Sequence, residues 1–64
     1  MGTERDKLDR QIWAFMREAE NNRRMPEDVR RMAATWLRSS EKFRREYLRF
    51  AALKMYQDYK SLLM

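Results

Sequence analysis

The stretch "PEDVRRMAATWL", residues 26 to 37, contains the clearest helix signal in this 64-residue chain. Its apolar residues recur at i, i+3, i+4, i+7 and i+8, which is the spacing of one face of an α-helix. These residues are Val29, Met32, Ala33, Trp36 and Leu37. We therefore predict a helix here whose apolar face lies in the core.

The residues on either side of this helix indicate where it begins and ends. Pro26 fits the first helical position, and the acidic Glu27 and Asp28 complement the exposed amides of a helix N-terminus. At the other end, Ser39 or Ser40 can cap a third helix that follows directly. The predicted second helix is therefore bounded on both sides within a few residues.

The segment before Pro26 also has a helical pattern. We predict a first helix from about Glu4 to Glu20, with Thr3 as its N-cap. Its apolar stripe is Leu8, Ile12, Phe15 and Ala19. In "NNRRMP", residues 21 to 26, two asparagines favour a left-handed C-cap conformation, and Pro26 prevents the helix from continuing.

The segment after Ser40 predicts the longest helix, roughly Glu41 to Leu63. One apolar row follows every fourth residue: Phe43, Tyr47, Ala51, Met55, Tyr59 and Leu63. Four more residues widen it: Leu48, Ala52, Tyr56 and Leu62. This apolar face is broader than contact with one neighbouring helix requires. Either the helix packs between both other helices, or part of its face is left for a partner, and we favour the first because so small a core must use every apolar group.

Composition supports one all-α domain of three helices over residues 1–64, with a long third helix. One glycine, one proline and few β-branched residues leave little to favour strands. The predicted core is Ile12, Phe15, Val29, Met32, Trp36, Phe43, Tyr47 and Ala51. Trp36 is expected at its centre.

Several classes of function are disfavoured by what the sequence lacks. Without cysteine or histidine there is no disulfide, thiolate zinc site or imidazole chemistry, and no phosphate-binding loop or nucleophile motif is present. We expect a protein that is not an enzyme and that has no cofactor or metal. The charged start "MGTERDKLDR" and the short apolar runs predict neither a signal peptide nor a membrane span, and thus an intracellular location in nucleus or cytoplasm.

The net charge of +5 is concentrated in the last two-thirds of the chain. Residues 1–20 carry a net charge of −1, and residues 21–40 and 41–64 carry +3 each. Eleven of the fifteen cations are arginine, which suits bidentate contacts with phosphate. The candidate nucleic-acid ligands are Arg23, Arg24, Arg30, Arg31, Arg38, Arg44 and Arg45. The alternative is that these arginines alternate with acids on solvated helix faces.

Two short motifs resemble the high-mobility-group box, a three-helix, L-shaped domain that bends DNA. "AFM" at residues 14–16 follows Arg10 by four residues, and Trp36 precedes Tyr47 by eleven, with Ala51 and Ala52 beyond. The resemblance implies DNA binding in transcription regulation, with Phe15 or Met16 inserted between base steps. Because Phe15 lies on the core stripe, Met16 is the better candidate for this wedge.

A second resemblance is to KIX domains of the Mediator type. "EYLRFAALKMY", residues 46–56, is similar to the last helix of those domains, and "RRM" before the second helix also matches them. These modules bind amphipathic activation helices in a hydrophobic groove. Our leading hypothesis from sequence is DNA binding through the arginines. The alternative is protein interaction, with an amphipathic helix or a second copy of the chain as partner, which six methionines would suit as an adaptable apolar surface.

Overall fold

The described residues form three helices, which confirms the all-α fold with a long third helix. The computed structural model describes residues 4–63. For residue 5 it describes the backbone alone. The proposed N-cap Thr3 lies outside the described residues. The elements are α1 (Glu4–Asn21), α2 (Glu27–Arg38), α3 (Glu41–Phe43), the π-helical turn η1 (Arg44–Leu48), α4 (Arg49–Tyr59) and the 3₁₀ turn η2 (Lys60–Leu63). The last four follow one another without a break, and we call them together helix three.

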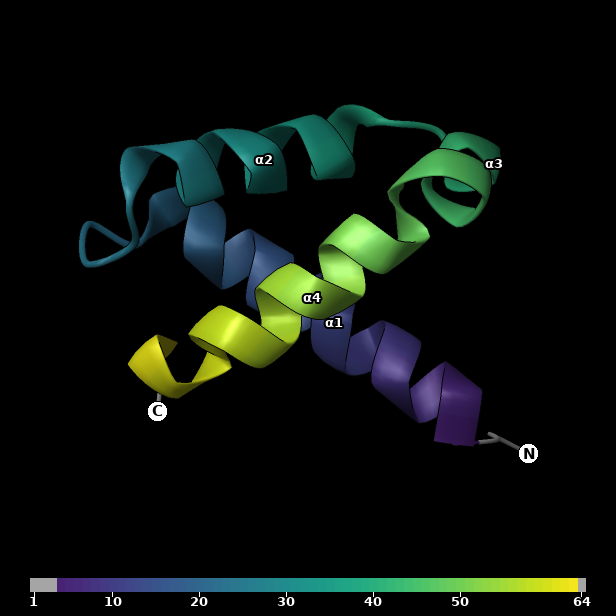
Figure 1. Cartoon of the computed structure of the whole chain (residues 1–64), viewed down its shortest axis with the longest axis horizontal. Helices are drawn as coiled ribbons and strands as arrows, with labels where there is room; N and C mark the ends of the chain where they lie inside the picture. Colours follow the sequence, from purple (N-terminus) through teal and green to yellow (C-terminus); the bar gives the residue numbers. More distant parts are fainter. Residues whose placement is uncertain (1–3, 64) are drawn as a thin grey trace.

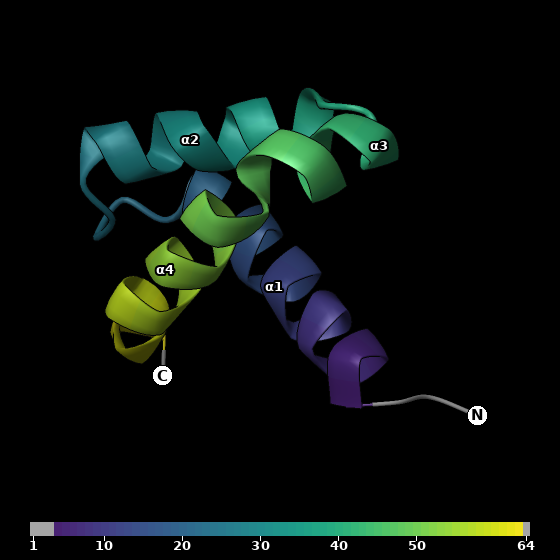
Figure 2. The same ribbon diagram turned by 45° about the vertical axis from the view of Figure 1, so that its right-hand side comes forward.

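Helix α1 is the central element, and both other helices pack against it. It contacts α2 on one side and α4 and η2 on the other, while α2 and α4 have little direct contact. Figures 1 and 2 show α2 along the top of the molecule; below it, α4 crosses in front of α1 in Figure 1, and the two diverge in Figure 2. Phe15 of α1 meets Tyr56 of α4 edge to face, with ring centroids 5.5 Å apart. Helix α1 thus joins the other two helices, which have few contacts with each other.

The connection from α1 to α2 is tight and differs from the predicted cap. The side-chain oxygen of Asn22 accepts a hydrogen bond from the amide of Arg24 at 2.8 Å, and its carbonyl accepts one from Met25 at 3.1 Å. No described residue has a positive φ, so the left-handed asparagine cap is wrong. A side-chain hydrogen bond makes the turn instead. Pro26 is the N-cap of α2 and not its first helical residue, so the helix begins at Glu27, one residue later than predicted.

Of the two serines between α2 and helix three, one caps the end of α2 and the other caps the beginning of helix three. Ser39 is the C-cap of α2, and its hydroxyl donates to the Thr35 carbonyl at 2.7 Å. Ser40 is the N-cap of helix three, and its hydroxyl accepts a hydrogen bond from the Phe43 amide at 3.2 Å. Of the two predicted candidates, Ser40 is the one that caps helix three.

Helix three is not regular, because its second turn is a π-helix from Arg44 to Leu48. Leu48 ends this turn with φ −107° and ψ 0°, away from the values of an ideal α-helix. A π turn takes more residues per revolution than an α turn, so it rotates everything after it relative to a uniform helical pattern. This one local feature changes which residues of helix three face the core.

The core is partly different from the predicted one, and the π turn bears only on the differences that follow Phe43 in the chain. The buried residues of the core are Ile12, Phe15, Met16, Ala19, Met25, Val29, Ala33, Trp36, Ala52 and Met55. Of the eight predicted members, Ile12, Phe15, Val29 and Trp36 are confirmed. The other four are wrong, since all are exposed: Met32, Phe43, Tyr47 and Ala51.

The centre of the core is also displaced from the predicted one. Met16 and Met25 are the largest fully buried side chains, at 0 % and 2 % exposure, whereas Trp36 retains 7 %. Met16 follows Phe15 on α1, and Met25 comes from the tight connection before α2. The turn between these two helices therefore closes over the deepest part of the interior, and Trp36 lies at its edge.

Candidate functional site

Arg44, one of the candidate phosphate ligands, is a structural residue. Its Nε donates to the carbonyl of Trp36 at 2.7 Å and one terminal nitrogen donates to the carbonyl of Leu37 at 2.8 Å. Both carbonyls belong to the last turn of α2; that of Trp36 also accepts a hydrogen bond from the Ser39 amide at 3.2 Å, and among the described residues no backbone N–H donates to that of Leu37. The positive charge also suits the negative end of the helix dipole. Arg44 therefore caps α2 from helix three.

Two tryptophans enclose the same guanidinium group. The Arg44 Cζ lies 4.9 Å from the ring centroid of Trp13 and 4.5 Å from that of Trp36. The two rings meet edge to face at 5.3 Å and 75°. Arg44 is half-buried. Because two of its N–H groups are bonded to α2 and its guanidinium lies against both rings, the prediction that Arg44 contacts phosphate does not fit its environment.

Two more of the candidate arginines are held in surface ion pairs. Arg31 lies 3.3 Å from a carboxylate oxygen of Glu27, and Arg45 lies 2.6 Å from one of Glu41. Both pairs have i, i+4 spacing and side chains more than 70 % exposed, so each contributes only a few tenths of a kcal/mol. These two positions match the alternative of a solvated helix face with alternating charge.

The remaining candidates do not form one continuous group of free cations. Arg30 is half-buried, and its Nε is a buried nitrogen without a hydrogen-bond partner. Arg23, Arg24 and Arg38 are exposed, and no ion pair joins their side chains to another described residue. Three of the seven predicted arginines are thus both exposed and outside any ion pair, which leaves them the best placed for phosphate binding.

Met16 is wrong as a candidate for insertion into DNA. Its side chain has 0 % exposure and lies within the core cluster. Its neighbour Trp13 has the opposite environment, with 42 % exposure. The prediction for Phe15 is confirmed, since it is 3 % exposed and packs on Tyr56. The reason is geometric: α1 is buried by α2 on one side and α4 on the other, which covers a wider face than one stripe.

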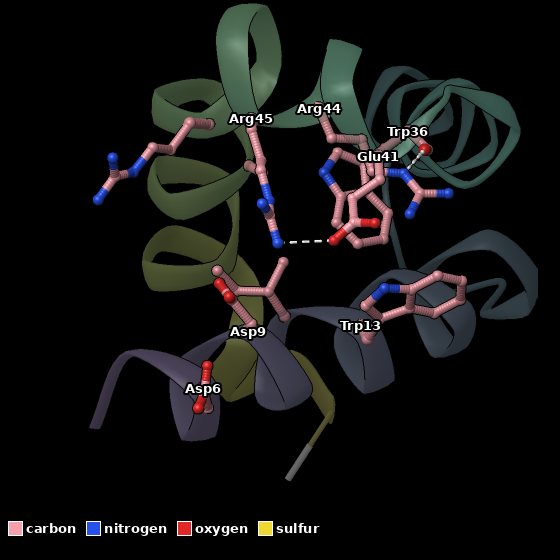
Figure 3. A pocket seen from close by; sticks show the side chains of 10 residues that line it. Asp6, Asp9, Trp13, Trp36, Glu41, Arg44 and Arg45 are labelled. Atoms are coloured by element: carbon pink, nitrogen blue, oxygen red, sulfur yellow. Dashed lines mark hydrogen bonds and ion pairs between the residues drawn. The ribbon is translucent and has the colours of Figure 1, made fainter. Parts of the chain in front are cut away.

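A cleft of about 370 Å³ opens between α1 and the first half of helix three. Trp13 and Trp36 line it together with Ile12 and Ala52. Figure 3 shows Asp6 and Asp9 on α1 opposite Arg45, which is paired with Glu41. Charges of both signs therefore surround an aromatic floor, and the acids reduce the positive potential that the arginines would create.

A second concave region lies between α2 and α4, and we call it the α2–α4 groove. It is an open depression of about 290 Å³, lined by Asp28, Val29, Met32, Ala51, Lys54, Met55 and Asp58. Its apolar surface comes from both helices, and its charged residues are two acids and one lysine. Met32 is 41 % exposed there, and Met55 is buried. The groove exists because α2 and α4 both pack on α1 and barely touch each other.

Helix three also exposes aromatic rings that do not line this groove. Phe43, Tyr47 and Phe50 are 45 %, 70 % and 82 % exposed, and the first two rings contact each other with centroids 5.0 Å apart. Contiguous exposed apolar surface of this kind marks interaction sites. The breadth of the apolar face in the sequence was the signal for Phe43 and Tyr47, but we favoured burial between the helices, which is wrong for these two residues. Phe50 lay outside the predicted apolar face.

Comparison with protein-family models, with curated proteins and with solved structures gave no match. None of the helices in residues 4–63 is long and apolar enough to cross a membrane. Within the same range, no group of three or more acidic side chains is placed to hold a metal ion. The site must therefore be interpreted from its geometry.

Proposed function

We propose that this chain is a helical protein-interaction module whose α2–α4 groove takes an amphipathic helix from a partner protein. The observation that carries the proposal is the groove itself. Its floor contains Val29 and Met55, and Met32 and Ala51 remain accessible on its two sides. An apolar helix face laid into such a groove buries surface that both partners otherwise expose to water.

The charges at the groove indicate the chemistry of the partner. Asp28 on α2 and Asp58 on α4 are both exposed and line it, with Lys54 as the one cation. The groove is therefore locally acidic in a chain whose net charge is +5. A partner helix with apolar anchors and adjacent arginine or lysine side chains complements it, and such complementarity contributes orientation and association rate.

The accessible methionine supports the same role. Met side chains are flexible and polarisable, so they adapt to anchors of different shape. Binding surfaces for helices use this property, and the groove combines an exposed Met32 from α2 with a buried Met55 from α4. The proposal assigns the chain a binding role and no chemical step.

A direct test uses a helix-stabilised peptide with leucine at i, i+4 and i+7 and one arginine beside the central leucine. We expect saturable binding that shifts the methyl NMR signals of Met32 and Met55. Met32→Glu should weaken binding about tenfold or more, because it places an acid on the apolar wall. Leu62→Glu is the matched control, since Leu62 is 43 % exposed and lies outside the groove.

The binding measurements on the two variants either support or contradict the groove as the peptide site. Binding that is lost in Met32→Glu and kept in Leu62→Glu supports the groove as the site. Equal binding to both variants, or no binding of the peptide to the unaltered chain, contradicts the proposal. Circular dichroism of the two variants checks that each has kept its helices.

Polyanion binding is the second candidate, and exposed Arg23, Arg24 and Arg38 favour it. It stays a prediction, with a smaller set of ligands than the sequence suggested. Titration with a short DNA duplex should show affinity that falls steeply with salt, because arginines on phosphates release counterions. The double variant Arg23→Ala/Arg24→Ala should reduce the salt dependence, while Arg31→Ala should not. No binding at low ionic strength would exclude this function.

A further inference from the structure

A row of exposed residues follows the outer face of helix three at every fourth position. Its members are Lys42, Glu46, Phe50, Lys54 and Asp58, and we call it the outer row. Residues four apart are neighbours along a helix surface, and the π turn, with more residues per turn, offsets part of the drift of such a row around the helix axis. The central residue, Phe50, is 82 % exposed, the highest value among the exposed large hydrophobic residues. The row thus has one large apolar group at its middle, with two charges on each side.

The signs of these charges are arranged antisymmetrically about Phe50. Reading along the chain they are positive, negative, ring, positive and negative. None of the four charged side chains forms an ion pair or hydrogen bond with a described residue. Their charges are therefore not already compensated within the chain, unlike those of Arg31 and Arg45.

We propose that the outer row pairs with the outer row of a second copy of this chain, antiparallel, around a two-fold axis at Phe50. A two-fold axis perpendicular to the helix places each residue before Phe50 opposite the one equally far after it. Glu46 then lies opposite Lys54 of the second copy, and Lys42 opposite Asp58. Each of the four charged residues then faces a residue of opposite charge on the other copy, and the two-fold axis repeats both pairs.

Other arrangements of two copies lack this match. With the helices parallel and in register, Glu46 would face its own copy and Lys54 would do the same, so like charges would repel. The antiparallel arrangement also brings the two Phe50 rings together at the axis, with Tyr47 nearby at 70 % exposure. Aromatic pairs of this kind add attraction beyond their buried area.

The geometry also sets the strength of the contact. Glu46 and Lys54 are each about one helical turn from Phe50, so the inner pairs and the rings form a compact centre. A single pair of helices buries less than a standard interface, and the net charge of +5 on each copy opposes association at low salt. We therefore expect a weak dimer in rapid exchange with monomer.

The dimer and the proposed function are separately testable. Lys54 and Asp58 belong to both the outer row and the α2–α4 groove, whereas Glu46 and Phe50 do not line the groove. Glu46→Lys and Phe50→Ala should weaken the dimer and leave the leucine peptide bound as before. Loss of peptide binding together with an intact dimer would mean that the groove proposal alone fails.

The decisive experiment is charge reversal, measured by sedimentation equilibrium up to about 1 mM protein. Glu46→Lys and Lys54→Glu should each weaken the homodimer about tenfold or more, because two attractive pairs become repulsive. An equimolar mixture of the two variants should form a heterodimer, since the lysines of one face the glutamates of the other. The double variant Glu46→Lys/Lys54→Glu should dimerise with itself.

Phe50→Ala gives an independent measurement that does not depend on charge. We expect it to weaken the dimer about a hundredfold, because each dimer loses two central rings. Leu62→Lys is the control and should leave the dimer unchanged. A monomer throughout the concentration series, or single reversals that dimerise like the unaltered chain, or a mixture that forms no heterodimer, would each overturn the proposal.

Discussion

The inner and outer faces of helix three differ in what they contact. On the inner face, Ala52 and Met55 are buried, and Leu48 packs against the core cluster from its edge. On the outer face, Tyr47 and Phe50 are 70 % and 82 % exposed. Both faces carry large apolar groups, so hydrophobicity alone does not separate them. Contact with α1 does, and the π turn decides which residues reach it.

Arg44 and Arg45 show the same contrast between adjacent residues. Arg44 donates to two carbonyls of α2 and lies against two tryptophan rings, while Arg45 has a side chain 73 % exposed and forms one ion pair. One guanidinium holds two helices together and the other remains in water. The two residues are chemically identical, so their different roles follow from their different positions on the helix.

The largest expected effect is at the ring that supports the inner face. Trp36→Ala removes a 93 % buried indole that also stacks on Arg44, and should destabilise the fold by about 3 to 5 kcal/mol. For so small a domain this approaches the whole free energy of unfolding. Urea denaturation followed by circular dichroism measures it. A cooperative transition with a loss below about 1 kcal/mol would contradict the placement of Trp36.

A pair of variants compares the two faces directly. Met55→Ala leaves a cavity on the inner face and should cost about 2 to 3 kcal/mol. Phe50→Ala removes a larger side chain from the outer face and should change stability by less than about 0.5 kcal/mol. Denaturation of both under conditions where the chain is monomeric gives the answer. Similar losses in the two variants would mean that the faces are not distinct.

Arg44→Ala tests the polar part of the inner face. We expect a loss of about 2 kcal/mol, because two charge-assisted hydrogen bonds and the stacking between tryptophans disappear together. Arg44→Lys keeps the charge but loses the planar fork, and should fall between Arg44→Ala and the unaltered chain. Thermal melts rank the three proteins. A lysine variant as stable as the unaltered chain would refute the importance of the planar geometry.

The smallest effect belongs to the neighbouring arginine. Arg45→Ala removes an exposed pair with Glu41 and should cost less than about 0.5 kcal/mol. The loss should vanish at high salt, since exposed pairs are screened. Melts at two salt concentrations measure this, with Arg31→Ala as the equivalent pair on α2. A loss as large as that of Arg44→Ala would remove the distinction between the two arginines.

Much of the fold could be predicted because its signals are local. The helix periodicity around Trp36, the stop at Pro26 and the serine cap at Ser40 each depend on residues within a few positions. The α1 stripe of Ile12, Phe15 and Ala19 is buried as expected. Local sequence determines these features because hydrogen bonding and side-chain periodicity act over one or two turns.

The candidate site was predicted less well, for a different physical reason. Arg44 is one of several similar arginines in sequence, and only its approach to the end of α2 gives it a structural role. Met16 is one of several apolar residues in α1, and only the packing of α2 and α4 on both sides buries it. The residues next to Arg44 and Met16 in the sequence give no indication of either contact.

By itself, the amino-acid sequence determined three amphipathic helices, their approximate ends and a surplus of arginine. Tertiary structure decided the rest: the π turn that rotates helix three, the methionines at the centre, and the aromatic rings left outside. An apolar pattern broader than half a helix can be packed in more than one rotation, because each offers similar burial. The choice between them is made only when the neighbouring helices compete for the same space.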